Sequence, residues 1–249
     1  MKGKDLVIFD LDGTLTLSKS SMDAVMAELI GKLLEAKRVA VISGGGFPQF
    51  ETQFVNKLPI QANRLSHLYL LPTSGTKLFT WQGTWHQQYS EELTKDSKDN
   101  IIAALKMSLA IAGFQTPQKI YGEQIEDRGS QITYSALGQN APLEEKLAWD
   151  PNLEKRIRLA ELLRSKLPRY DVRIGGSTSI DITMRGVNKA YGIHKLEAFL
   201  RIPIDRMVFV GDALFQGGND YPARTTGVDC VQVAGPEETK KLISKWLTE

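Results

Sequence analysis

FDLDGTLT, residues 9–16, places two carboxylates, Asp10 and Asp12, one residue apart and directly before a Gly-Thr turn. The run that leads into it, residues 5–9 (DLVIF), is largely apolar. Such a run is typical of a strand buried on both faces, as in a parallel sheet. Open α/β sheets bind ligands beyond the carboxyl ends of their strands. The two acids therefore stand where this fold class would place a reactive site.

Helix and strand patterns alternate outward from this segment. Residues 20–36 carry an apolar stripe at helical spacing, and residues 38–43 form a second continuous apolar run. The same alternation returns near the C-terminus, where Pro236 opens the last predicted helix. The remaining predicted elements of this kind are helices over 48–58 and 189–200 and strands over 206–210 and 228–233. This alternation predicts the α/β class with a parallel sheet.

The middle of the chain has a different pattern, which begins with two short strands predicted around Gly83. The other predicted elements of this region are helices over about 91–112 and after Pro151, and strands over 131–137, 171–176 and 179–185. Strands gathered with helices in this way predict an α+β insertion. We therefore expect a discontinuous core, residues 1–82 and 187–249, interrupted by an inserted domain over residues 83–186.

The composition of the chain narrows the classes of function. Its 249 residues are 42% hydrophobic and carry a formal net charge of +2, which favours neither nucleic acid nor an anionic membrane as a partner. The single cysteine, Cys230, excludes an internal disulfide and fits a reducing compartment. The N-terminus lacks the apolar stretch of a signal peptide, and no run approaches the roughly 20 apolar residues that span a bilayer. We expect a cytoplasmic protein that acts on a small molecule.

Four polar clusters follow predicted strands or open a predicted helix. They are Asp10 with Asp12, Ser43 with Gly44, Lys189, and Asp212 with Asn219 and Asp220. If the strands are neighbours, these clusters meet at one edge of the sheet, and their chemistry suits phosphoryl transfer. Asp10 can attack phosphorus and become an aspartyl phosphate. Asp12 can protonate the leaving oxygen and then activate the group that attacks the phosphoenzyme.

The same clusters offer ligands for a cation and for a phosphate. Mg2+ prefers hard oxygen ligands, and the side chains expected to provide them are Asp10, Asp12, Asp212, Asn219 and Asp220. Ser43 and the backbone amides at Gly44 can hold phosphate oxygens, and Lys189 adds a positive charge at the transferring group. A solvated turn, an ordinary loop and a surface lysine would explain these features singly. Their common order at strand ends favours a phosphoryl-transfer site.

These motifs resemble the haloacid dehalogenase (HAD) superfamily of phosphotransferases, in which DLDGT carries the nucleophile and Ser43, Lys189 and GD…ND form the other motifs. FDLDGTLT, IGGSTSID, NKAYGI and VFVGDALFQGGNDYPA together are similar to the eukaryotic-type phosphomannomutases over nearly the whole chain. The resemblance implies a Rossmann-like core, a type C2B α+β cap that determines substrate specificity, and a homodimer formed through the caps. It also implies that Ser179 and Asp181 face a sugar.

One stretch of the expected cap departs from that family, whose arginines there hold the phosphate distal to the reaction. Arg128 matches one of these arginines, but the later ones are replaced by Ser135, Gln139 and Lys146. Fewer bidentate clamps weaken the grip on a bisphosphate intermediate. The first hypothesis is therefore a Mg2+-dependent phosphatase of a small phosphorylated metabolite such as a sugar phosphate. The alternative is a phosphomannomutase. A third hypothesis, a non-catalytic phosphate-binding module, would require a broken acid pair or metal site.

Overall fold

The computed structural model describes residues 1–18, 20–58, 64–114, 117–175 and 177–248. The chain forms two compact units, a core unit of Met1–Ser90 with Val187–Glu249 and a second unit of Glu91–Gly186. The core unit thus continues past residue 82, where the sequence analysis places its boundary. The reason is that strand β5 (Trp85–Ser90) pairs with β4 (Lys77–Trp81) and so belongs to the sheet of the core unit.

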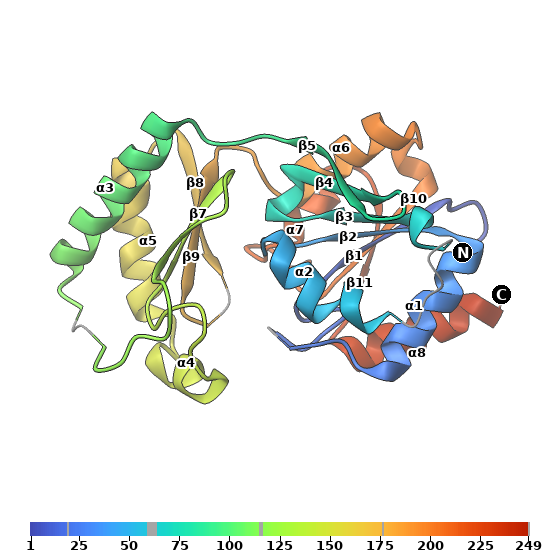
Figure 1. Ribbon diagram of the computed structural model, residues 1–249, viewed down its shortest axis with the longest axis horizontal. Coiled ribbons are helices and arrows are strands. Elements are labelled where there is room, and N and C mark those ends of the chain that lie inside the picture. Colours follow the sequence, from blue (N-terminus) through green and yellow to red (C-terminus); the bar gives the residue numbers. More distant parts are fainter. Residues whose placement is uncertain (19, 59–63, 115–116, 176, 249) are drawn as a thin grey trace. The chain divides into compact units, whose positions relative to one another are not determined.

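A seven-stranded sheet in the order β11-β10-β1-β2-β3-β4-β5 forms the centre of the core unit (Figure 1). The first five strands of this order are parallel, and β4 and β5 form an antiparallel extension. The remaining strands are β1 (Leu6–Asp10), β2 (Arg38–Ile42), β3 (Leu68–Leu71), β10 (Met207–Gly211) and β11 (Asp229–Gln232). The predicted α/β class with a parallel sheet is confirmed.

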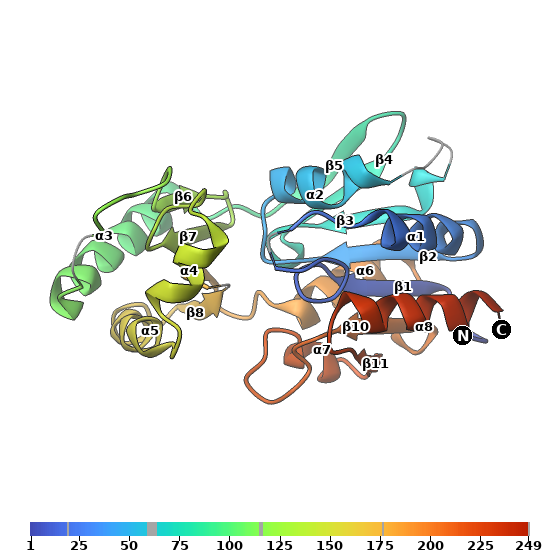
Figure 2. The same ribbon diagram turned by 90° about the horizontal axis from the view of Figure 1, so that it is seen from below.

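Helices cover both faces of this sheet, because its central strands are apolar on both sides. Val7 and Phe9 belong to one buried cluster, whereas Leu6 and Ile8 belong to the other. In Figure 2, α1 and α8 lie in front of the sheet and α6 lies behind it. The helices of the core unit are α1 (Ala24–Ala36), α2 (Phe47–Gln53), α6 (Lys189–Leu200), α7 (Tyr221–Arg224) and α8 (Pro236–Thr248), and its short 3-10 turns are η1 (Val55–Lys57), η2 (Leu65–His67), η3 (Thr73–Gly75) and η4 (Ile204–Arg206).

The second unit is an antiparallel sheet with the strand order β6-β7-β9-β8 and two long helices on one face (Figure 1). Ile132, Ile180 and Ile182 point into the apolar cluster beneath the helices. Thr133 and Asp181 alternate with them and are directly paired across two strands, so the opposite face is polar. The elements are α3 (Lys95–Ala112), β6 (Ile125–Asp127), β7 (Gln131–Ser135), α4 (Leu143–Trp149), α5 (Glu154–Lys166), β8 (Tyr170–Gly175) and β9 (Ser179–Met184).

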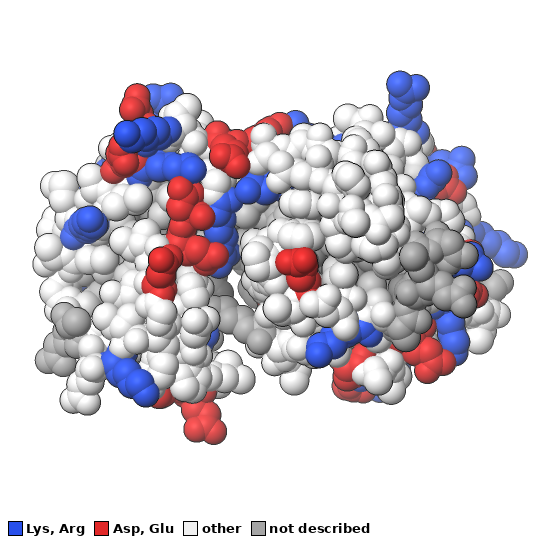
Figure 3. Space-filling view, in the orientation of Figure 1, with Lys and Arg blue, Asp and Glu red and all other residues white. Residues whose placement is uncertain are grey.

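Charged side chains of both signs are interspersed on the face shown in Figure 3. This distribution agrees with the small net charge of +2. No helix within the described ranges combines the length and the apolar character needed to cross a bilayer.

Close packing between α6 and the turn after β3 fixes where α6 begins. The glycines Gly192 and Gly75 face each other, so that a Cβ on Gly75 would stand 2.6 Å from the Gly192 Cα. A Cβ on Gly192 would collide with the Ile42 side chain and stand 3.2 Å from the Ser74 carbonyl oxygen. Because both positions lack a side chain, the first turn of α6 can lie against the ends of β2 and β3.

We expect Gly192→Ala to destabilise the protein, although alanine ordinarily stabilises a helix by about 1 kcal/mol relative to glycine. Overpacking of a tight core contact costs about 1–3 kcal/mol, and the neighbours here are buried. Urea unfolding followed by circular dichroism measures the change. His194→Ala, at an exposed position of the same helix, is the control and should change stability by no more than about 0.5 kcal/mol. Equal stability of Gly192→Ala and the unmodified chain would contradict this account.

Candidate active site

Three neighbouring strands of the core unit end in the predicted polar clusters. β1 ends at Asp10, β2 ends directly before Ser43, and β10 ends directly before Asp212. β1 pairs in parallel with both β2 and β10, so the three carboxyl ends lie side by side. The topology therefore brings these clusters to one edge of the sheet, where α/β folds place their ligands.

Three carboxylates meet at this edge. Asp10, Asp212 and Asp220 each offer an oxygen, and these oxygens lie within 4.8 Å of one another. Asp220 is fully buried, and its Oδ2 accepts a hydrogen bond from the Ala213 amide at 3.1 Å. Among the described residues, Asp10 Oδ2 and Asp220 Oδ1 are buried acceptors without a hydrogen bond, although the Lys189 ammonium lies 3.3 Å from Asp220 Oδ1. Because such atoms are costly to bury alone, the cluster is suited to a ligand that these oxygens can bind.

Lys189 supplies a positive charge inside the acid cluster. It is the first residue of α6, directly after the N-cap Asn188. Its Nζ donates to Asp10 Oδ1, and it also donates to the Ile42 carbonyl at 2.7 Å. The same nitrogen lies 3.3 Å from Asp220 Oδ1. One buried ammonium group therefore contacts two carboxyl groups of a cluster of three, which leaves an excess of negative charge when all three are ionised.

Burial and mutual repulsion shift the proton affinities of these groups. Burial raises the pKa of Asp10 well above its ordinary value; Lys189 opposes this shift and Asp220 adds to it. Burial, followed by the charge of Asp220, also raises the pKa of Asp212. Burial alone would lower the pKa of Lys189, but Asp10 and Asp220 together raise it above its ordinary value. Lys189 therefore stays charged, and the carboxyl groups favour a second positive charge.

The acid cluster fits a divalent cation of the Mg2+ type. Such a cation takes carboxylate oxygens as ligands and keeps several water molecules. Asp10, Asp212 and Asp220 offer oxygens at mutual distances that one ion can bridge, and Asp10 and Asp220 each keep a buried oxygen without a hydrogen bond. These three residues could hold the metal, and the excess negative charge beside Lys189 favours it.

The structure does not bring Asp12 and Asn219 into this cluster. The Asp12 carboxylate is held by Gln49 of α2, whose Nε2 donates to Asp12 Oδ2 at 2.8 Å. Asn219 is exposed, in contrast to the buried Asp220 that follows it. Their assignment as metal ligands therefore stays a prediction. Gln49 is missed by the sequence analysis, because a glutamine in a short helix carries no motif.

The Ser43 loop is supported by a strained turn that the sequence analysis also misses. Ser43 is 4% exposed, and its Oγ accepts from the Gly45 amide at 3.1 Å. Its carbonyl accepts from the Ser74 amide at 2.8 Å. Thr73 and Ser74 both have positive φ, 50° and 58°, which is costly for residues with a side chain. Buried, strained backbone beside a predicted phosphate-binding serine is typical of a functional site.

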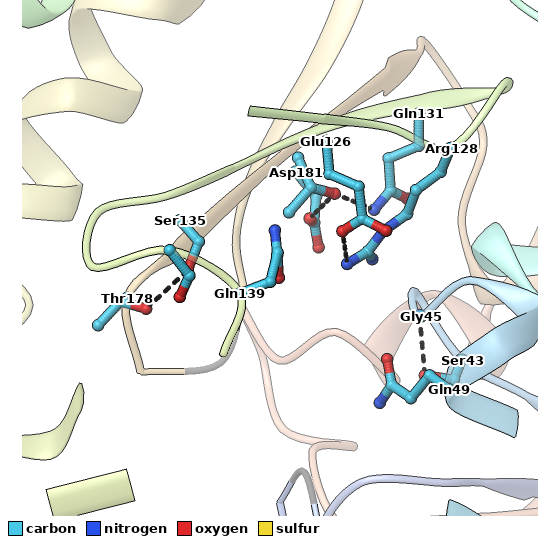
Figure 4. Close-up of polar contacts among 12 residues, drawn as sticks. Ser43, Gly45, Gln49, Glu126, Arg128, Gln131, Ser135, Gln139, Thr178 and Asp181 are labelled. Carbon is cyan, nitrogen blue, oxygen red and sulfur yellow. Dashed lines mark hydrogen bonds and ion pairs between the residues drawn. The ribbon is translucent and has the colours of Figure 1, made fainter. Parts of the chain in front are cut away.

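The predicted sugar-facing residues lie in the second unit, on or beside its polar sheet face (Figure 4). Asp181 Oδ1 accepts from Thr133 Oγ1 at 2.8 Å, and Ser179 is buried on the same strand. Arg128 pairs with Glu126, with 2.7 Å between Arg128 NH2 and Glu126 Oε2. The guanidinium group is thus charge-compensated within its own unit.

The positions of the missing family arginines are also accounted for. Ser135 Oγ lies 3.1 Å from Thr178 Oγ1, and Figure 4 shows this pair together with Gln139. Lys146 is 5% exposed and its Nζ donates to the Gln139 carbonyl at 2.9 Å. Gln139 Nε2 is a buried donor without a partner in the described part of the chain. These positions therefore offer a hydroxyl group, an amide group and one buried ammonium group, and no guanidinium group.

Comparison with known proteins supports the chemistry of this site. The family described as "Eukaryotic phosphomannomutase" matches residues 26–249. A probable phosphomannomutase of Caenorhabditis elegans is 27% identical over 259 aligned residues, covering 99% of this chain and 96% of the relative. The phosphomannomutase of Spinacia oleracea is 28% identical, covering 95% of this chain and 93% of its own length.

Solved structures share the fold at lower sequence identity. The IMP-bound, N-terminally truncated IMP-nucleotidase of Plasmodium falciparum superposes with a TM-score of 0.71 at 19% identity, covering 100% of this chain and 69% of that one. A haloacid dehalogenase-like hydrolase from Bacteroides thetaiotaomicron superposes with a TM-score of 0.62 at 13% identity, covering 98% and 99% of the two chains. The chain thus belongs to the eukaryotic phosphomannomutase family.

Proposed function

We propose that this enzyme is a Mg2+-dependent phosphatase that moves the phosphoryl group of a small sugar phosphate first to Asp10 and then to water. The observation that carries the proposal is the position of Asp10. It ends a buried strand, bonds to Lys189, and lies within 4.8 Å of carboxylate oxygens of Asp212 and Asp220. A nucleophile in such surroundings is held rigidly and beside the positive charge that a phosphate dianion needs.

In the first step, a carboxylate oxygen of Asp10 attacks phosphorus, and the bond from phosphorus to the sugar oxygen breaks. Asp12 gives its proton to that leaving oxygen, so that a neutral hydroxyl departs. In the second step, Asp12 takes a proton from water, whose oxygen attacks the phosphorus of the aspartyl phosphate. The bond from Asp10 to phosphorus then breaks and releases inorganic phosphate.

Other side chains keep these groups in place. Lys189 neutralises charge at Asp10 and at the transferring oxygens, and Ser43 offers its hydroxyl to the phosphate. Gln49 holds Asp12 through the 2.8 Å hydrogen bond to its carboxylate. Mg2+, held by Asp10, Asp212 and Asp220, would supply further positive charge against the phosphate oxygens.

The residues at the family's distal-phosphate positions in the second unit favour hydrolysis over isomerisation. A mutase must hold a second phosphoryl group while its intermediate changes orientation, and this favours several free guanidinium groups. Here Arg128 is already paired with Glu126, and Lys146 is buried against a backbone carbonyl. Ser179 and Asp181 suit the hydroxyl groups of a sugar, and we assign substrate specificity to this unit.

A phosphomannomutase is the second candidate, because the family match spans residues 26–249. It would use the same Asp10 and Asp12 chemistry. The two activities differ only in the acceptor of the second step, which is water in one and a sugar hydroxyl in the other.

We expect Asp10→Asn to lower steady-state phosphate release at least about a thousandfold and to abolish the acid-stable phosphoenzyme, because the nucleophilic oxygen is lost. Asp12→Ala should lower turnover about 100- to 10,000-fold but still permit some labelling of Asp10. Acid-quenched reactions with 32P-labelled substrate measure both. The control is Asp205→Asn, at an exposed position of the core unit. Wild-type turnover in Asp10→Asn would refute the nucleophile assignment.

A panel of sugar mono- and bisphosphates with Mg2+ decides between the two acceptors. We expect inorganic phosphate to be the main product from a sugar monophosphate, because the second unit compensates its own Arg128. Free phosphate and isomerised sugar phosphate are quantified in the same reaction. If mannose 1-phosphate with a catalytic amount of bisphosphate yields mannose 6-phosphate faster than phosphate, the mutase is correct.

We also propose a homodimer formed through the second unit. Leu143 and Leu147 of α4 are 49% and 56% exposed, and Ile157 of α5 is 43% exposed. Apolar side chains of this size on one unit favour an interface. Light scattering coupled to size exclusion gives the molar mass, and a mass near twice 27.7 kDa is expected. A monomer at high concentration would refute the proposal.

A further inference from the structure

A pocket of about 270 Å³ lies at the edge of the second unit's sheet, entirely within that unit. The arginines Arg164, Arg173 and Arg185 line it, together with Asp171. They come from α5, from β8, which is an edge strand of the sheet, and from the residue after β9. None of the residues discussed so far for the second unit lines this pocket.

Arg164 is held in a fixed position across the edge of the sheet. Its Nε and NH2 both donate to the Val172 carbonyl, at 3.2 Å and 2.9 Å. Covering an edge-strand carbonyl protects the sheet from pairing with other chains, and this explains why an arginine stands at position 164. It does not explain why two more arginines converge on the same pocket.

Arg173 is fixed by a second set of contacts. Its NH2 donates to Asp171 Oδ2 at 2.9 Å, and the same oxygen accepts from the Gly186 amide at 2.9 Å. The side chains of Arg173 and Asp171 stay partly exposed, at 31% and 29%. The guanidinium group is therefore preorganised but still accessible from the pocket.

The pocket carries more positive than negative charge. Three guanidinium groups face one carboxylate, that of Asp171. Within the described ranges, neither Arg164 nor Arg185 forms an ion pair with a carboxylate. Like charges gathered in one concave place repel one another, and an anion relieves that repulsion.

We propose that this pocket is a binding site for a phosphoryl group. Guanidinium forks bind phosphate oxygens in a bidentate manner, and two of the three forks are already held in place. The volume of about 270 Å³ is below the roughly 300–1,000 Å³ of pockets for drug-sized ligands, so it fits a phosphoryl head group, and the rest of a larger metabolite must lie outside it. The phosphoryl group comes either from the substrate itself, as a second phosphate, or from a separate phosphorylated metabolite.

The site differs from the distal-phosphate clamp that the family resemblance implies. That clamp would use position 128, where Arg128 is paired with Glu126, and positions 135, 139 and 146, which are here a serine, a glutamine and a buried lysine bound to a backbone carbonyl. The present pocket instead uses an α5 side chain and the edge strand β8. Binding of inorganic phosphate to it does not require Asp10 to be a nucleophile, so the proposal can be tested apart from the proposed function.

The binding test uses the full chain and inorganic phosphate as the probe. Arginine side-chain NMR signals of Arg164, Arg173 and Arg185, assigned through single Arg→Lys variants, should shift on titration. Arg185→Gln should weaken the binding seen at the other two arginines by at least about tenfold, the effect of losing a charge-assisted hydrogen bond. Arg158→Gln, at an exposed position on α5, removes the same charge on the same helix and should leave it unchanged.

Arg185 is the safest position to change, because its side chain is exposed and holds no strand in place. Thermal unfolding verifies that Arg185→Gln folds as the unmodified chain does. Absence of phosphate-dependent shifts at all three arginines would overturn the proposal. Equal weakening by Arg185→Gln and Arg158→Gln would also overturn it, because a general charge effect would then suffice.

Kinetics identify the source of the phosphoryl group. If it belongs to the substrate, Arg185→Gln should raise KM about tenfold for a sugar bisphosphate and leave KM for a monophosphate unchanged. If it belongs to a separate metabolite, a nucleoside diphosphate should alter monophosphate turnover in the unmodified enzyme and not in Arg185→Gln. Either result supports the site. If the unmodified enzyme releases no phosphate from any substrate, the proposed function is refuted. The phosphate-binding site is then tested by the NMR titration alone.

Discussion

The close approach of Asp10, Asp212 and Asp220 is the constraint on which the core unit depends. Three carboxylate oxygens within 4.8 Å repel one another, and the burial of Asp10 and Asp220 limits the screening of this repulsion by water. Lys189 offsets part of this repulsion through its contacts with Asp10 and Asp220. The remainder favours protonation or a bound cation. The fold thus keeps an excess of negative charge at this site. This excess lowers the stability of the protein, and it is useful for a reaction that requires a bound cation.

The surrounding backbone makes this arrangement attainable. Gly13 has φ of 89°, and a Cβ there would stand 2.5 Å from Asp212 Oδ2, so the turn after β1 leaves room for that carboxylate. The facing glycines Gly75 and Gly192 let α6 bring Lys189 to the end of β1. Parallel pairing of β1 with β2 and β10 brings Asp10, Ser43 and Asp212 together, because it aligns the carboxyl ends of the three strands.

The sequence predicted the α/β class, because continuous apolar runs mark buried parallel strands. It also predicted that Asp10, Ser43, Lys189 and Asp212 lie together, because the two acids and the serine directly follow such runs. It could not reveal Gln49 beside Asp12, because that contact depends on how α2 packs and not on spacing. The positive φ values of Thr73 and Ser74 could not be predicted either, because threonine and serine are not typical of left-handed backbone conformations. The predicted domain boundary at residue 82 did not account for β5, which pairs with β4 in the sheet of the core unit.

Because hydrolysis and isomerisation share the same core chemistry, the second unit must decide which one occurs. In the proposed mechanism the aspartyl phosphate is open to attack by water and by a sugar hydroxyl, so the outcome would depend on how long the sugar stays bound and in which orientation. An ion pair within the unit, such as Arg128 with Glu126, offers little additional charge to a second phosphoryl group. The pocket of Arg164, Arg173 and Arg185 keeps a net positive charge at the edge of the same sheet, because Asp171 pairs with Arg173 alone. Family membership therefore constrains the first phosphoryl transfer strongly, and it constrains the acceptor of the second only as far as the cap arginines are retained.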